Sequence, residues 1–461
     1  MAGGGADPGA VDPVEPTLGP RELGAAGLAR LRGGLRALSD FDPHEWRILA
    51  PLMFVGFFEV YDLTVLTIGA PQIADGLGVS IGVFGVGVAV IRLAALGSVP
   101  ILRAADRIGR RTMLLVSIAA FTAATGLTAL ASGLAAFVAI QIVARAFLAT
   151  ESSLGAVVIS EEVRKERRGA ALSLVGVMSF LGPGLTALAI LAVPLTPLDW
   201  RIFYVIALPP LFVIAYLRRN LGETTAFAVA ETEDRLQQRL IPRVPEPYAS
   251  RLRRIATVFG VAGAIQTAAF FYSSALAQDE YGWNALYTAT ILTAGPFALA
   301  GFLLGGPGSD RIGRRPVLAT ALVLGVISNL MIFSEVRPLF VPGFWVAASA
   351  NAAVLAVGYA YLSELFPTEL RATLTSVVVA AQIAGGSIGL LVVAALAGAV
   401  DTSLQLVVGG LLAAPVILLL RGLPETRGAD VTLAHPATAD MGASPPRPPT
   451  GGLPRRSTSR E

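Results

Sequence analysis

The sequence has no cysteine and only two histidines, His44 and His435, among its 461 residues. Without cysteine, the disulfide framework that staples many small secreted domains is excluded. Both histidines lie in the tails of the chain, and no phosphate-binding loop, nucleophile elbow or metal-ligand cluster accompanies them. We therefore expect no enzymatic activity, no cofactor, no metal site and no ATP-driven pump.

Charged residues are also scarce. They make up 15% of the chain, against roughly 25% in a soluble globular domain. Hydrophobic residues make up 54%, and the mean hydropathy is +0.67. Such a chain cannot cover a large water-facing surface, which excludes a soluble enzyme, a nucleic-acid binder and a disordered scaffold. The composition predicts a polytopic membrane protein embedded in the lipid bilayer.

Long apolar runs alternate with short polar breaks along most of the chain. A membrane-spanning helix needs about 20 apolar residues, and twelve runs meet this length. They lie near residues 48–73, 81–103, 112–132, 135–160, 170–193, 201–218, 256–277, 286–307, 316–334, 340–362, 372–398 and 402–420. We divide the chain into a tail (1–46), a six-helix bundle (47–218), a polar linker (219–255), a second six-helix bundle (256–420) and a disordered tail (421–461).

The basic residues predict the orientation of these spans. If both tails lie on one side of the membrane, that side holds 31 of the 35 lysines and arginines, and the other side holds only Arg201 and Arg337. Positive residues concentrate on the cytoplasmic side. We therefore expect a multi-pass protein of the cell (plasma) membrane with both termini cytoplasmic, and no removable signal peptide.

An internal repeat relates the two halves of the chain. Three motifs recur at offsets of 204, 203 and 202 residues: Asp106-Arg-Ile-Gly-Arg-Arg111 with Asp310-Arg-Ile-Gly-Arg-Arg315, Glu161 and Arg168 with Glu364 and Arg371, and Leu221-Gly-Glu-Thr224 with Leu423-Pro-Glu-Thr426. Such a near-constant offset predicts two pseudo-symmetric bundles, the arrangement of a transporter whose halves rock around a central site.

These motifs resemble those of the major facilitator superfamily over roughly residues 45–430. Gly306-Pro-Gly-Ser-Asp-Arg-Ile-Gly-Arg-Arg315 matches the family's loop signature throughout, whereas the first copy has Leu102 in place of the glycine. Glu59-Val-Tyr-Asp62 is similar to a first-span segment of the metabolite:proton symporter branch, and other motifs resemble sugar porters. An arginine of the symporter branch falls on Gln141.

The resemblance implies an all-α major facilitator fold and secondary transport by alternating access. We expect proton-coupled uptake (symport) of a small polar organic solute, which is a carboxylate, a zwitterion or a sugar, by a monomer that has no nucleic-acid partner. Proton-antiport efflux of a drug or metabolite is the alternative, and a non-transporting membrane receptor is a third possibility.

Five charged side chains fall at membrane depth in the predicted spans, all in the first half: Glu59, Asp62, Arg92, Arg145 and Glu151. Each costs roughly 3 kcal/mol or more at membrane depth unless it is paired or hydrated. The helical rise places Asp62, Arg92 and Arg145 at one level and the two glutamates at another.

Our hypothesis is that Asp62 carries the coupling proton and that Arg145 or Arg92 tunes it. Burial favours the neutral form of a carboxyl group, and a nearby arginine favours the charged form. The alternative is a fixed ion pair between Asp62 and one of these arginines. Arg92 is also a candidate clamp for an anionic substrate. Glu59 is a second proton site, a contact for a cationic substrate or a neutral buried acid.

The second half offers only neutral polar groups at membrane depth, namely Gln266, Asn329, Asn351 and Gln382. This asymmetry suggests ion coupling in the first half and a substrate pocket shaped by the second.

The repeated loop motifs are candidate gates. We expect their acids to latch neighbouring helices through the arginines, although basic loops can also serve topology alone. The candidate gating residues are Asp106, Arg107, Gly109, Arg110, Arg111, Glu161, Arg168, Gly306, Asp310, Arg311, Gly313, Arg314, Arg315, Glu364 and Arg371.

Overall fold

The computed structural model describes residues 41–164, 167–218 and 244–427. Twelve helical stretches in these ranges are long and apolar enough to cross a membrane, which confirms the number of spans expected from the sequence. Residues 1–40 and 428–461 of the tails, most of the linker and the Leu221–Thr224 motif lie outside the described residues.

The N-terminal half, residues 43–218, forms the first six spans. Its helices are α2 (Pro43–Ile68), α3 (Ala70–Gly76), α4 (Ile81–Leu93), α5 (Ser98–Ile108), α6 (Arg110–Thr128), α7 (Leu134–Glu162), α8 (Arg168–Ser179), α9 (Gly182–Ala192) and α10 (Ile202–Arg218). A 3-10 turn joins α4 to α5, so these two helices build one span, as α8 and α9 also do.

The C-terminal half, residues 248–422, forms the other six. Its elements are α12 (Tyr248–Ala275), a π-helical turn η5 (Leu276–Glu280), α13 (Asn284–Ile312), α14 (Arg314–Ile332), α15 (Arg337–Leu365), α16 (Thr368–Leu396), α17 (Thr402–Ala413) and a 3-10 helix η6 (Ala414–Gly422). The seventh span begins earlier than residue 256, because α12 starts at Tyr248 and its first two turns include Arg251, Arg253 and Arg254, which fall in the linker expected from the sequence.

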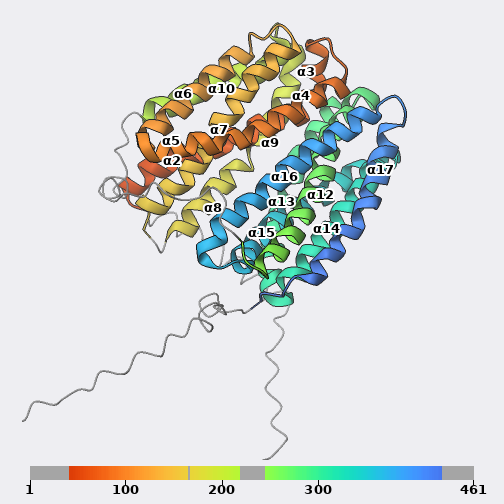
Figure 1. Cartoon of the computed structure of the whole chain (residues 1–461). Helices are drawn as coiled ribbons and strands as arrows, with labels where there is room; N and C mark the ends of the chain where they lie inside the picture. Colours follow the sequence, from red (N-terminus) through yellow and green to blue (C-terminus); the bar gives the residue numbers. More distant parts are fainter. Residues whose placement is uncertain (1–40, 165–166, 219–243, 428–461) are drawn as a thin grey trace, which may run out of the picture.

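Equivalent helices pack in equivalent ways in the two halves. In the N-terminal half α2 packs on α8 and α9, and α6 packs on α7; in the C-terminal half α12 packs on α16, and α14 on α15. Figure 1 shows the two groups of helices side by side. The sequence repeat is thus a structural repeat.

Large apolar side chains cover much of the outer surface. Phe212, Leu304 and Leu412 are each more than 60% exposed, although they belong to long apolar helices. A water-soluble protein rarely exposes such contiguous apolar surface, whereas a lipid bilayer accommodates it.

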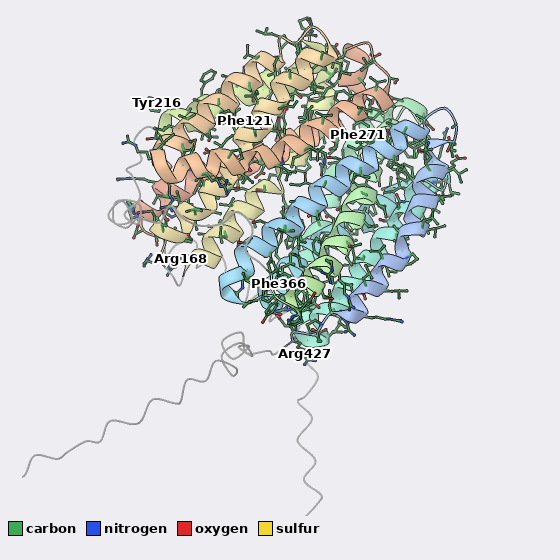
Figure 2. All side chains as sticks on the ribbon, viewed as in Figure 1. Phe121, Arg168, Tyr216, Phe271, Phe366 and Arg427 are labelled. Carbon is green, nitrogen blue, oxygen red and sulfur yellow. The ribbon has the colours of Figure 1, made fainter. Side chains whose placement is uncertain are left out.

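The two halves share a hydrophobic core at one end only. We call this end, which carries α3, the far end. There the ring of Phe84 on α4 stacks on the ring of Phe271 on α12, with centroids 6.2 Å apart. Phe271 is labelled in Figure 2. At the opposite end, the basic-loop end, where α6 and α14 begin, each half has a separate core. The ribbons of the two halves draw apart toward that end (Figure 1).

Hydrogen bonds also join the two halves at the far end. Gln72 of α3 donates to Gln278 of η5 at 2.6 Å, and Gln278 donates to the Ile68 carbonyl at 3.0 Å. Ser274 donates to the Thr67 carbonyl at 2.8 Å. All of these groups lie near the far end, so the structure is a state closed at the far end.

Candidate functional site

The centre of the N-terminal half holds a buried acid that lacks a close counter-ion. Asp62, on α2, is only 4% exposed, and its Oδ2 atom has no hydrogen-bond partner among the described residues. The charges that act on it are those of Arg145 and Glu59. Within the described part of the chain, however, Asp62 forms no ion pair shorter than 4.0 Å.

Arg145 and Arg92 form the positive side of this cluster. Arg145, on α7, is 8% exposed, and its Nε and Nη1 atoms are buried without a partner among the described residues. Arg92, on α4, is close enough to Arg145 to interact with it electrostatically. Its Nη2 atom lies 3.0 Å from the position that a Cβ on Gly386 of α16 would take. Arg92 therefore reaches from the N-terminal half to the C-terminal half.

The two glutamates also have neighbours outside this group. Glu59 accepts a short hydrogen bond from Ser152, the residue that follows Glu151 on α7. Its charge also reaches Tyr359 of α15, in the other half. Glu151 itself is completely buried. Gln141 is completely buried and donates to Thr128 of α6 at 3.2 Å, so this side chain points into the bundle.

The neutral polar residues of the second half surround a cavity. A cavity of about 100 Å³ lies inside the C-terminal half, between α12, α14, α15, α16 and η6. Gln266, Asn329, Asn351 and Gln382 all line it, together with apolar side chains such as Phe270 and Phe344. The structure thus brings together the four amides that the sequence singled out.

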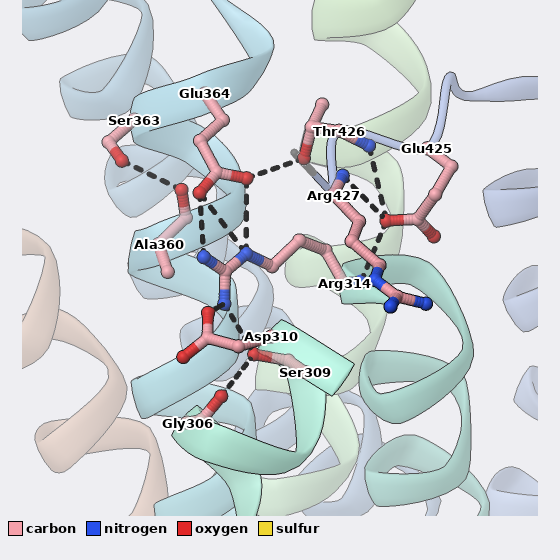
Figure 3. A network of polar contacts seen from close by, with 10 residues as sticks. All are labelled: Gly306, Ser309, Asp310, Arg314, Ala360, Ser363, Glu364, Glu425, Thr426 and Arg427. Carbon is pink, nitrogen blue, oxygen red and sulfur yellow. Dashed lines mark hydrogen bonds and ion pairs between the residues drawn. The ribbon is translucent and has the colours of Figure 1, made fainter. Parts of the chain in front are cut away.

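The loop motif of the second half forms a polar network at the basic-loop end (Figure 3). Arg314 binds Glu364 of α15 at 2.7 Å and Asp310 of α13 at 2.6 Å. Thr426 donates to the same Glu364 carboxylate at 2.6 Å. Glu425 accepts from the backbone N–H of Arg314 at 2.7 Å and so caps the start of α14. This network ties four segments of the C-terminal half together.

The first half repeats the contact between Arg314 and Glu364. Arg110, the counterpart of Arg314, binds Glu161 at 2.7 Å. The described structure does not pair Glu161 with Arg168 or Glu364 with Arg371, contrary to our expectation. Arg168 instead donates to the Val163 carbonyl at 3.0 Å. Two Arg371 nitrogen atoms are buried without a partner among the described residues.

The remaining loop residues have diverse environments. Gly109 and Gly313 have φ angles of +105° and +122°, a region that favours glycine, and each ends one helix directly before the next. No atom lies within 4 Å of a Cβ placed on Gly306, so this glycine is not required for close helix contact.

The other charged residues of the loops are exposed or bind backbone. Arg111 and Arg311 are exposed, and Arg315 donates to the Leu423 carbonyl at 2.9 Å. The side chains of Asp106 and Arg107 lie outside the described part of the structure.

The sequence alone does not predict one ion pair at the basic-loop end, which joins a buried carboxylate to a half-exposed arginine. Glu45, in the first turn of α2, is 2% exposed and binds Arg164 through two side-chain hydrogen bonds of 2.9 and 2.7 Å. Asp42 and Glu45 form a capping box, and the Asp-x-x-Glu spacing announces it. That signal predicts the helix start but not the partner, which is 119 residues away.

Comparison with known proteins supplies independent information. The family model described as Major Facilitator Superfamily matches residues 52–307 and 292–450. The chain is 26% identical over 307 residues to a putative metabolite transport protein of Haemophilus influenzae, covering 62% of this chain and 73% of that one. It is 26% identical over 353 residues to an ectoine/proline transporter of Corynebacterium glutamicum, covering 68% and 69%.

A solved structure shows the same fold. The crystal structure of a D-xylose-proton symporter superposes with a TM-score of 0.68 at 17% identity, covering 84% of this chain and 99% of that one. At this identity the likeness concerns the fold alone.

Proposed function

The chain belongs to the major facilitator superfamily, and on this basis we propose that it is a proton-coupled secondary transporter of a small polar organic solute, working by alternating access. Transport of metabolites or sugars is common to its relatives. The observation that carries the proton coupling is Asp62, a buried carboxyl group that lies near an arginine without pairing with it.

The coupling mechanism follows from two opposing effects on one carboxyl group. Removal from water favours a neutral acid, and a neighbouring guanidinium favours the charged one. A fixed, close ion pair would leave the acid permanently charged, and the described structure contains no such pair at Asp62. Asp62 is therefore suited to exchange a proton as the halves move, with Arg145 tuning it and Arg92 as a second positive charge.

The orientation belongs to the same proposal. The basic loops place the basic-loop end in the cytoplasm of a plasma-membrane protein. The described state, closed at the far end, then faces inward. Import moves a solute from the far end to the basic-loop end, and we propose uptake as the physiological direction.

Proteoliposomes test the coupling. A solute is first selected by thermal-shift screening of carboxylates, amino acids and sugars, and its labelled form is then offered to vesicles with a pH gradient. We expect the wild type to accumulate it from an acidic exterior, and Asp62→Asn to lose accumulation while still exchanging labelled for unlabelled solute. Asp75→Asn, which changes an exposed acid on α3, is the control and should accumulate normally.

Two results would contradict the proposal. Gradient-driven accumulation that survives in Asp62→Asn would remove Asp62 from the coupling. Accumulation that requires an acidic lumen would show antiport in place of symport.

A further inference from the structure

We infer that the cavity inside the C-terminal half is a binding site for a small uncharged solute that carries hydrogen-bonding groups. This inference rests on the proposed transport function and narrows its substrate class. The cavity lies within one half of the molecule, bounded by α12, α14, α15, α16 and η6, and not between the halves.

The first argument is the chemistry of the lining. None of the described residues that line the cavity is charged. Placing a charged group there would cost several kcal/mol because nothing compensates it. An occupant with hydroxyl or amide groups, by contrast, finds both donors and acceptors in carboxamide side chains.

The second argument is that these amides have unused hydrogen-bonding capacity. Gln266, Asn351 and Gln382 make no side-chain hydrogen bond within the described structure. Asn329 is only 2% exposed, and its Nδ2 atom donates to the Leu406 carbonyl of α17 at 2.6 Å. This bond fixes the amide and leaves its Oδ1 atom buried without a partner. Buried polar atoms of this kind normally bind something.

The amides lie at a similar height in the bundle. Counted along the helical rise, Asn329, Asn351 and Gln382 all lie about 21–23 Å from the basic-loop ends of their helices. Arg92 approaches Gly386, which is one helical turn beyond Gln382 on α16. The helix that supplies Gln382 to the cavity is thus also the helix that Arg92 of the other half approaches.

The size of the cavity limits the occupant. A volume of about 100 Å³ holds roughly seven to ten water-sized groups. That is the size of a monosaccharide or a single substituted ring.

Binding measured by isothermal titration in detergent tests the inference without any gradient. The probes are xylose and nicotinamide, which are uncharged, and proline and nicotinate, which carry charges. We expect at least one uncharged probe to bind. Its affinity should fall roughly three- to tenfold in Asn351→Leu and in Asn329→Leu, the loss of one hydrogen bond. Asn329→Leu also removes the hydrogen bond to α17, so a weaker affinity in that variant can reflect a folding defect. Asn351→Leu breaks no such bond and serves as the cleaner test.

Control variants separate this inference from the proton coupling. Gln405→Leu removes a carboxamide of α17 that bonds the Val400 carbonyl outside the cavity, and it should bind the probe normally. Because the titration is made without a pH gradient, it reports on the cavity whether or not Asp62 couples proton movement to transport. The inference is overturned if neither uncharged probe binds, if a charged probe binds and loses affinity in Asn351→Leu, or if both asparagine variants bind undiminished.

Discussion

At the scale of single residues, charged side chains occur in two kinds of environment: close ion pairs in the loops, and a buried acid without a close ion pair within the first bundle. Arg314 and Glu364 satisfy each other through a two-pronged contact at the basic-loop end, a geometry that fixes position. Asp62 and Arg145, in contrast, influence each other without such contact. The same residue types thus hold the loops together in one place and lie without a close ion pair in the other, where we propose proton exchange.

The ion pair of Glu45 gives a prediction at this scale. Glu45→Gln removes the buried carboxylate that Arg164 binds, whereas the new amide oxygen can still accept the capping-box hydrogen bond. We expect a loss of stability on the order of 2 kcal/mol, seen as a lower melting temperature in detergent.

Glu246→Gln is the matched control. It breaks the pair of Glu246 with Arg253, whose side chains are 61% and 72% exposed, and exposed pairs contribute little. Equal melting temperatures for the two variants would argue against a structural role for the Glu45 contact.

At the scale of helices, glycine sets how closely neighbours approach. Gly385 of α16 faces Gly260 of α12 so closely that a Cβ on Gly385 would lie 1.9 Å from the Gly260 carbonyl oxygen. Gly182, where α8 gives way to α9, meets the backbone of α2 at Tyr61 in a similar way. Small residues allow membrane helices to pack backbone to backbone, which here holds equivalent pairs in both halves.

Gly385→Ala tests this packing. The added methyl group cannot be accommodated unless α12 and α16 separate, because the obstacle is backbone. We expect a cost of about 1–3 kcal/mol and a lower melting temperature in detergent. Gly409→Ala on α17, where nothing lies within 4 Å of the new Cβ, should melt like the wild type. The packing argument fails if the two alanine variants behave alike.

At the scale of the whole molecule, the joint at the far end defines the state. Core residues of both halves merge there, whereas the basic-loop end keeps two separate cores. Alternating access requires this joint to open. The contact of Gln72 with Gln278 is then a bond that must break in every cycle.

The absence of cysteine makes this testable by cross-linking. We expect a double variant, Gln72→Cys with Gln278→Cys, to lose at least nine-tenths of its transport when oxidised or bridged by a short thiol reagent. Reduction should restore activity. The two single variants are the controls and should respond to neither treatment. Full transport by the cross-linked protein would show that the far end need not open.

Sequence alone determined the membrane character, the number of spans, the internal repeat and the identity of the charges at membrane depth. These properties depend on composition and on local patterns, because about 20 consecutive apolar residues suffice to specify a span. The amides that line the cavity could also be identified from the sequence, because each is a polar residue within an apolar run.

Only the tertiary structure decided which groups meet. The sequence spacing suggested Arg168 and Arg371 as partners of Glu161 and Glu364, but the described contacts are made by Arg110 and Arg314. Glu45 finds Arg164 across 119 residues, and Arg92 reaches the opposite half. Such pairings depend on how each helix is rotated and packed against the others, a property of the assembled bundle that no local pattern contains.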